Sequence, residues 1–108
     1  MLMEHENCPC METCPLNRAM ALIGGKWKMQ ILCSLYNNGP TRYNQLKKAL
    51  DGVSNTVLAN ALRELEEDGL VHRREYLEVP VRVEYAITEP CRQLIPILDA
   101  LGDWSMAL

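Results

Sequence analysis

No stretch of this sequence is apolar over the roughly 20 residues that a helix needs to cross a bilayer. The first ten residues are acidic and lack the positive start and apolar centre of a signal peptide. Histidine is scarce, and neither His5 nor His72 lies beside a plausible nucleophile and acid in the sequence. We therefore expect a cytoplasmic protein that does not associate with membranes, is not an enzyme and holds no cofactor.

Acidic residues are missing between residues 13 and 50, a stretch that contains six basic ones. The whole chain nevertheless has a net charge of −3, because three acids precede this stretch and eleven follow it. With 108 residues, of which 48% are hydrophobic and 23% charged, the chain has the size and composition of one globular domain. A local positive surface on such a domain is sufficient to attract nucleic acid, since the field near a site matters more than the total charge.

Residues 53–70 have the pattern of an amphipathic helix. Ser54 is suited to cap its first turn, and Gly69 is suited to end it in the left-handed conformation. The apolar stripe recurs at spacings of one, three or four residues and comprises Val57, Leu58, Ala61, Leu62 and Leu65. The first half of the opposite face carries short, amide-bearing or cationic side chains that suit base edges. These base-reading candidates are Asn55, Thr56, Asn60 and Arg63.

Three shorter helices are expected before this one. Cys14-Pro15 opens the first, with a buried stripe of Leu16, Ala19, Met20 and Ile23. The second covers about residues 26–36, and the third covers about residues 43–50 with Thr41 as its cap. The third helix and residues 53–70 are joined by about four residues, which is a helix-turn-helix arrangement whose second helix enters the major groove.

After Gly69 the hydrophobic period changes to two. Residues 81–87 alternate as a strand with one buried face, residues 70–77 are rich in β-forming residues, and residues 78–80 connect them as a hairpin loop. A hairpin directly after a recognition helix is a wing, and Arg73, Arg74 and Arg82 give this one positive charge. Pro90 then opens a last helix whose apolar face is larger than one small domain needs, which indicates a partner surface. The predicted fold class is α+β, mostly α, with a winged helix-turn-helix domain.

Basic residues around the recognition helix are candidates for contacts with the DNA backbone. They are Lys26, Lys28, Arg42, Lys47 and Lys48 before the helix, and Arg74 and Arg82 in the wing. Arg82 has two alternative roles. It could enter the minor groove or hold a phosphate, or it could form a salt bridge with Glu84 or Glu75.

Six segments of the chain, taken in order, resemble the HxlR family of winged helix-turn-helix regulators. They are Cys14-Pro15, LIGGKW at residues 22–27, TRYNQLKKAL, LANALRELEEDGLV, EVPVRVEYAIT and LIPILDALGDW. The resemblance implies a small bacterial or archaeal DNA-binding protein, most often a repressor, that dimerises through its first and last helices. Two departures are visible: the family usually has a glycine in place of Pro90 or Cys91, and Cys8 and Cys10 are present in addition to the usual cysteine before Pro15.

The resemblance also implies how the chain is divided. Residues 1–13 would be a flexible arm and residues 14–108 the winged helix-turn-helix domain, with the wing at about 70–88 and a C-terminal dimerisation helix at about 90–106. The N- and C-terminal helices would form the dimer interface through Leu16, Met20, Leu94, Leu98, Leu101 and Trp104. Such a homodimer would place two recognition helices about 34 Å apart on a near-palindromic double-stranded operator.

The cysteines offer a sensing chemistry. Cys14 lies at a helix start, where the helix dipole favours the thiolate and should lower the pKa, and Cys91 has a similar position. Together with Cys8 and Cys10 they are candidates for sensing an oxidant or a small-molecule electrophile; the alternative is that they are small, buried or idle thiols. A zinc or iron–sulfur site built from Cys8, Cys10, Cys14 and His5 is a further alternative, although its spacing is not a usual one.

The sequence and its resemblance therefore predict a homodimeric, sequence-specific transcriptional repressor, with Cys14 as the candidate sensor of an oxidant or electrophile. The alternatives are a winged-helix protein-interaction module and a metal-sensing regulator that uses the cysteine-rich N-terminal arm.

Overall fold

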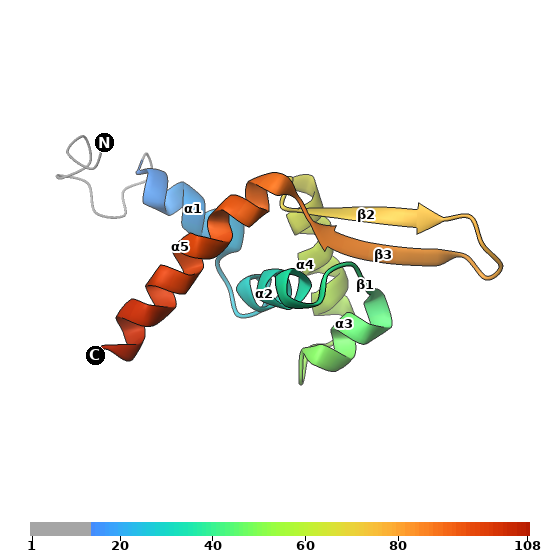
Figure 1. Ribbon diagram of the computed structural model, residues 1–108, viewed down its shortest axis with the longest axis horizontal. Helices are drawn as coiled ribbons and strands as arrows, with labels where there is room; N and C mark the ends of the chain where they lie inside the picture. The colour runs from blue at the N-terminus through green and yellow to red at the C-terminus, as the bar shows by residue number, and fades with distance from the viewer. Residues whose placement is uncertain (1–13) are drawn as a thin grey trace.

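A computed structural model describes residues 14–108 and contains, in that part of the chain, five helices and one small sheet (Figure 1). The elements are α1 (Pro15–Ile23), α2 (Lys28–Asn38), β1 (Thr41–Arg42), α3 (Tyr43–Ala49), α4 (Asn55–Glu67), β2 (Val71–Tyr76), β3 (Arg82–Ile87) and α5 (Glu89–Met106). The strands are antiparallel in the order β1-β3-β2. The predicted α+β, mostly helical winged helix-turn-helix fold is confirmed.

Helix α4 begins and ends where the sequence indicates. The hydroxyl of Ser54 accepts a hydrogen bond of 3.1 Å from the backbone N–H of Val57, which satisfies one open donor of the first turn. Gly69 follows the helix with φ +82°, and the N–H of Leu70 donates to the carbonyl of Leu65 at 2.9 Å. This is the helix ending that a glycine in the left-handed conformation allows.

The core lies where α2, α3 and α4 meet the base of the wing and the start of α5. Its fully buried side chains come from all of these elements and include Ile31, Leu32, Leu35, Leu46, Leu58, Leu65, Val71 and Cys91. Since each large apolar side chain contributes about 1.5–3 kcal/mol when fully buried, this cluster fixes the positions of α3 and α4 relative to α2.

Thr88 connects the end of α4 to the start of α5. Its hydroxyl donates to the carbonyl of Gly69 at 2.7 Å and accepts from the N–H of Cys91, the third residue of α5, at 3.4 Å. Its backbone N–H donates to the carbonyl of Leu70 at 3.1 Å. One residue therefore caps α5 and holds the turn that ends α4.

The predicted cap of α3 is wrong by one residue. Thr41 is buried, pairs with Tyr85 in the two-residue strand β1, and donates its hydroxyl to the carbonyl of Gly39 at 2.7 Å. The N-cap position is held by Arg42, whose backbone N–H donates to Oε1 of Gln45 at 3.2 Å. Sheet pairing with a segment more than 40 residues away outweighs the local capping preference of Thr41.

The burial predicted for three other elements also differs. In α1 only Ile23 is buried, while Leu16 and Met20 are 56% and 49% exposed. Val57 of the α4 stripe is exposed, and β3 does not have one buried face, because the wing projects from the domain and only Ile87 at its base is buried.

The wing tip and the C-terminus lie at opposite ends of a molecule 56 Å long (Figure 1). None of the helices within residues 14–108 is both long and apolar enough to span a membrane.

Candidate nucleic-acid interface

The outward face of α4 carries the four predicted base-reading residues. Asn55, Thr56, Asn60 and Arg63 are all exposed. They lie in the first nine residues of the helix, whose N-terminal N–H groups also favour a negatively charged partner. The acidic residues Glu66, Glu67 and Asp68 follow at the other end of the helix. The polar face is thus divided along its length into a part free of acid and an acidic part.

Two of these side chains act as one unit. Nη1 of Arg63 donates a hydrogen bond of 2.9 Å to Oδ1 of Asn60, three residues earlier on the same helix. This bond orients the amide of Asn60 so that its N–H₂ group remains available as a donor. The guanidinium keeps further donors that could reach a base edge or a phosphate.

Tyr43 connects the two helices of the helix-turn-helix, a role that the sequence did not indicate. Its hydroxyl lies 3.1 Å from the carbonyl oxygen and 3.2 Å from Oδ1 of Asn55, the first residue of α4. The side chain of Asn55 is therefore held at the junction of α3 and α4. The only sequence signal was a tyrosine on the inward side of α3, which is equally typical of a simple core residue.

Lys28 is engaged within the domain. Its Nζ lies 2.7 Å from Oε1 of Glu64, and its side chain is only 13% exposed. Hydrogen bonding and charge attraction from Lys28 lower the pKa of Glu64. The predicted role of Lys28 as a contact to the DNA backbone is not supported by this arrangement. Instead the pair joins the first turn of α2 to the middle of α4.

Beside this pair lies a shallow hollow of about 250 Å³ between the α1–α2 connection and α4. Lys26, whose Nζ lies 5.0 Å from the ring centroid of Trp27, and Asn60 of α4 both line this hollow. Lys26 has no salt bridge with any residue between 14 and 108, so its charge is available to a phosphate passing beside α4.

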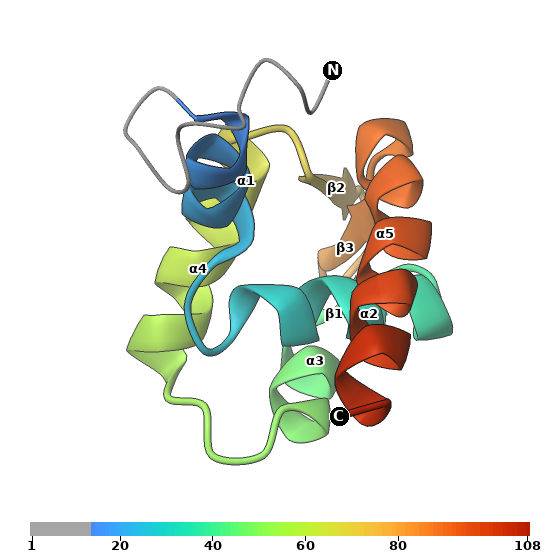
Figure 2. The same cartoon turned by 90° about the vertical axis from the view of Figure 1, so that its left-hand side faces the viewer.

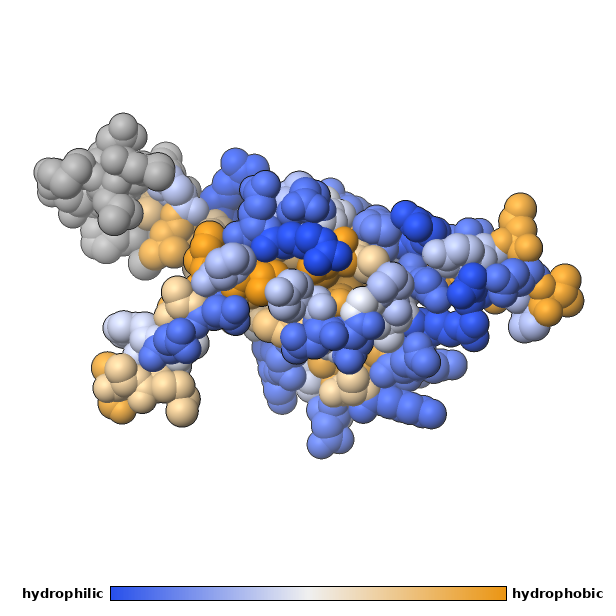
Figure 3. All heavy atoms as spheres, in the orientation of Figure 1, coloured by the Kyte–Doolittle hydropathy of each residue, from blue (hydrophilic) through white to orange (hydrophobic). Residues whose placement is uncertain are grey.

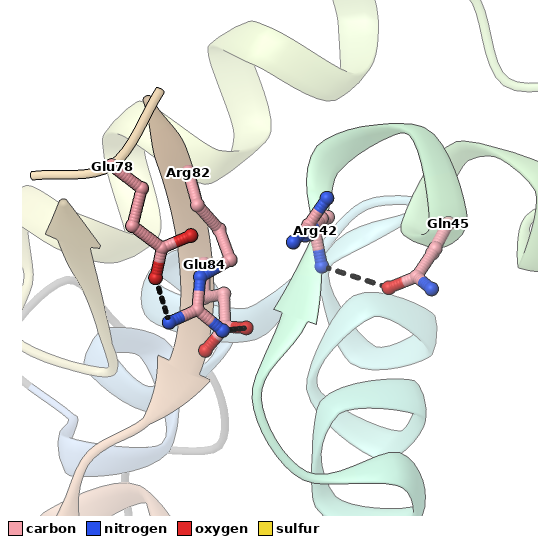
Figure 4. A network of polar contacts seen from close by, with 5 residues as sticks. All are labelled: Arg42, Gln45, Glu78, Arg82 and Glu84. Carbon is pink, nitrogen blue, oxygen red and sulfur yellow. Dashed lines mark hydrogen bonds and ion pairs between the residues drawn. The ribbon is translucent and has the colours of Figure 1, made fainter. Parts of the chain in front are cut away.

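The cations of α3 are also available. Arg42, Lys47 and Lys48 form no salt bridge with any residue in the described range, and no acidic residue lies between residues 13 and 50. The backbone N–H of Arg42 donates to Gln45 (Figure 4), and Arg42 is an exposed residue. These three side chains give the helix that precedes α4 a positive surface.

In the wing, by contrast, Arg82 is surrounded by its own partners. Its guanidinium lies 2.8 Å from Glu78 and 3.2 Å from Glu84 (Figure 4), and it stacks 3.9 Å from the ring centroid of Tyr76. Of the two roles that the sequence left open, this geometry favours the salt bridge with Glu84. The alternative partner Glu75 instead pairs with Arg73 at 3.2 Å, and Arg74 is the wing arginine without an ion pair in the described structure.

The cysteines differ in environment. Cys14 holds the N-cap position of α1, as predicted, and is 5% exposed. Cys91 lies in the first turn of α5 as expected but is fully buried, and this burial raises the pKa of its thiol, so the lowered pKa predicted for it is wrong. Cys33, which was not a candidate, is exposed, and partial burial and Asp99 raise its pKa. Cys8, Cys10 and His5 lie outside the described residues, and residues 14–108 contain no cluster of three metal-ligating side chains.

Helices α1 and α5 present apolar side chains to solvent. Leu16 and Met20 on α1 and Leu101 and Trp104 on α5 are each about half exposed or more, while Leu94 and Leu98 are partly buried against the core. The two helices are separate in Figure 2, and hydrophobic surface gathers at this end of the molecule in Figure 3. Their apolar faces are therefore not covered by each other within one protomer.

Comparison with known proteins finds helix-turn-helix regulators. Residues 22–108 match the family model described as HxlR-like helix-turn-helix. An HTH-type transcriptional regulator from Halalkalibacterium halodurans is 42% identical over 92 residues, which are 85% of this chain and 81% of the relative. The HTH-type regulator YdzF from Bacillus subtilis is 41% identical over 93 residues, covering 86% of this chain and 85% of YdzF.

Solved structures with the same fold include regulators described by their redox state. The redox regulator HypR in its oxidized form has a TM-score of 0.80 and 37% identity, covering 88% of this chain and 97% of HypR. The reduced form of the transcriptional regulator YodB from B. subtilis has a TM-score of 0.79 and 31% identity, covering 85% of this chain and 90% of YodB.

Proposed function

The chain belongs to the HxlR-like helix-turn-helix family of DNA-binding transcriptional regulators, and on this basis we propose that it is a homodimeric repressor of a near-palindromic operator. The observation that carries the proposal is the acid-free half of the outward face of α4. Asn60 and Arg63 lie there as a hydrogen-bonded pair, next to the available cations of α3. Amide and guanidinium groups that reach base edges from a helix are suited to sequence-specific reading of the major groove.

The acidic residues of α4 are compatible with this role. Glu64 is neutralised by Lys28, and Glu66, Glu67 and Asp68 lie past the last proposed base reader. In a groove that the helix enters by its N-terminal half, these carboxylates would remain outside the phosphate backbone. The proposed backbone contacts are Lys26, Arg42, Lys47, Lys48 and Arg74, which have no ion pair within residues 14–108.

The apolar faces of α1 and α5 support the homodimer. Half-exposed Leu16, Met20, Leu101 and Trp104 are costly for a monomer in water, and a second copy would cover them. A twofold dimer then presents two α4 helices to successive major grooves, about 34 Å apart. Occupation of such a site near a promoter would block transcription.

Operator selection from genomic fragments tests the proposal. We expect enrichment of a near-palindromic site whose half-sites are one helical turn apart. Replacement Arg63→Ala should weaken binding to it by about 1–3 kcal/mol and relax the preference at one base position per half-site. Binding that ignores sequence, or no binding at low salt, would contradict the proposed function and favour a protein-docking role for the domain.

Cys14 is the proposed sensing residue. It holds the N-cap position of α1, two residues before Leu16, so oxidation there would alter the position of the helix on which the spacing of the two α4 helices depends. The similarity to HypR and YodB supports a thiol switch. Diamide should release wild-type protein from the operator and leave Cys14→Ser bound; equal release of both proteins would remove Cys14 from the mechanism.

A further inference from the structure

The reading face of α4 consists of Asn55, Thr56, Asn60 and Arg63. Its two asparagines both have their side-chain oxygen engaged within the protein. Oδ1 of Asn60 accepts a hydrogen bond of 2.9 Å from Nη1 of Arg63, and Oδ1 of Asn55 lies 3.2 Å from the hydroxyl of Tyr43. Each amide still has two N–H groups to donate. Both asparagines are exposed, and neither N–H₂ group forms a hydrogen bond within residues 14–108.

The other side chains of the reading face add donors and little that accepts. Arg63 has no acceptor group, and it keeps further N–H groups beside the one that it gives to Asn60. The hydroxyl of Thr56 donates or accepts, so it places no demand on its partner. One oxygen of the nearest carboxylate, that of Glu64, is bound by Nζ of Lys28 at 2.7 Å. The reading face therefore presents mainly hydrogen-bond donors.

The base edges in the major groove differ in what they offer to such a face. Guanine presents two acceptors, N7 and O6, whereas thymine presents one acceptor beside a methyl group, adenine one acceptor beside a donor, and cytosine a donor. The usual contact of asparagine with adenine needs both the oxygen and the N–H₂ group of one amide.

In the reading face the amide oxygens already have partners. A donor from adenine that approached Oδ1 of Asn60 would also approach the positive guanidinium of Arg63. At Asn55 the same donor would compete with the hydroxyl of Tyr43. Guanine is therefore the base that complements this face best.

We propose that the reading face of α4 recognises guanine at the base positions that Asn55, Asn60 and Arg63 contact, and that it discriminates against adenine there. This recognition rests on the proposed function, which places α4 in the major groove of an operator. Tyr43 is a positioning residue, because its hydroxyl engages the oxygen of Asn55 and leaves only the N–H₂ group for DNA.

Modified bases in the selected operator test the recognition of guanine. The contacted positions are those at which Asn55→Ala, Asn60→Ala or Arg63→Ala relaxes the base preference of the full-length protein. 7-Deazaguanine still pairs with cytosine, but it has a carbon in place of the acceptor N7. Inosine is the matched control, because it keeps N7 and O6 and lacks only the amino group in the minor groove. We expect 7-deazaguanine at a contacted position to weaken binding about tenfold and inosine to change it by less than about twofold.

The variant Tyr43→Phe tests the positioning role. It removes only a hydroxyl group and keeps the ring, so the protein should fold as the wild type does. The released amide of Asn55 can then bind adenine through both of its groups, and the roughly tenfold preference for guanine over adenine at its position should fall to about twofold or less. Tyr36→Phe is the matched control and should keep the wild-type preference, because Tyr36 is an exposed residue of α2 whose hydroxyl has no hydrogen-bond partner within residues 14–108.

Three results would overturn these assignments. A base other than guanine at the contacted positions overturns the recognition of guanine, and so does an affinity that 7-deazaguanine leaves unchanged. In Tyr43→Phe, an unaltered preference or an equal loss of affinity for the guanine and adenine operators overturns the positioning role of Tyr43. Failure of the wild-type protein to select any operator overturns the proposed function, and the recognition of guanine with it.

Discussion

Helix α3 and Arg42 at its start carry three cations, and the wing also carries three. In only one of these two regions are all three cations outside ion pairs in the described structure. Arg42, Lys47 and Lys48 are not paired with any carboxylate in residues 14–108. In the wing, Arg73 and Arg82 are paired, and Arg74 alone is not. Equal numbers of basic residues in two adjacent elements therefore imply different interactions with DNA, and a charge is informative only together with its partners.

The two regions also differ in how they are held. Helix α3 is anchored by Leu46, which is fully buried in the core, whereas Leu77 and Val79 at the end of the wing are fully exposed and the hairpin is held by its own ion pairs and ladder. The helix-turn-helix thus depends on the stability of the whole domain. The end of the wing depends only on local contacts.

The largest expected effect tests this difference in anchoring. Replacement Leu46→Ala removes a fully buried side chain and should lower the free energy of unfolding by about 2–5 kcal/mol, because the lost contacts leave a cavity. Leu77→Ala at the wing tip, where the side chain is 96% exposed, should change it by less than about 0.5 kcal/mol. Urea unfolding at one protein concentration measures both, and comparable losses would show that the wing tip packs more closely than the structure indicates.

A smaller effect separates available from neutralised cations. Lys48→Ala should reduce the slope of log affinity against log salt by about 0.9, because one phosphate contact is lost. Arg73→Ala should leave the slope nearly unchanged, since Glu75 already neutralises this side chain at 3.2 Å. Titrations of operator DNA between low and moderate salt give the two slopes, and equal changes in both would remove the distinction between the regions.

The smallest effect concerns the ion pair Lys28–Glu64, which joins α2 to α4. Hydrogen bonding to Lys28 lowers the pKa of Glu64 in the folded protein below its ordinary value of 4.5. A lowered folded pKa means that this stabilisation is present above the unfolded pKa and is lost as the pH falls through the folded one. Glu64 is exposed, so the contribution is small.

Unfolding measured from about pH 6 to about pH 3 tests this sign. The wild-type free energy of unfolding should fall more steeply with decreasing pH than that of Glu64→Gln. The matched control is Glu67→Gln on the same helix, a side chain without an ion pair in the described structure, and it should follow the wild-type slope. Parallel curves for wild type and Glu64→Gln would mean that the pair does not persist in solution.

Features encoded by neighbouring residues were predictable from the sequence. The start of α4 at Ser54, its apolar stripe and its end at Gly69 each depend on residues within a few positions of one another, and the structure confirms them apart from Val57. The hairpin of the wing was predictable for the same reason.

Features that depend on distant residues were not predictable. Lys28 forms an ion pair with Glu64, which is 36 residues away, although several other carboxylates lie at a similar separation in the sequence. Thr41 became part of a sheet because β3 passes beside it, and Tyr43 meets Asn55 only after α3 and α4 have packed. Arg82 forms an ion pair with Glu78 and not with Glu75, and this too depends on how the hairpin turns.

The hydrogen bonds of Thr88 have a mechanical consequence. Because this one residue caps α5 and bonds to both Gly69 and Leu70, α5 cannot tilt at its start without either breaking these bonds or moving the end of α4 with it. A change in the angle of α5 at its start is therefore coupled to the position of the last turn of α4. In the proposed dimer, a change in how the two copies meet along α5 would be transmitted to the angle of α4, and by thermodynamic reciprocity a bound operator would favour one way for the two copies to meet.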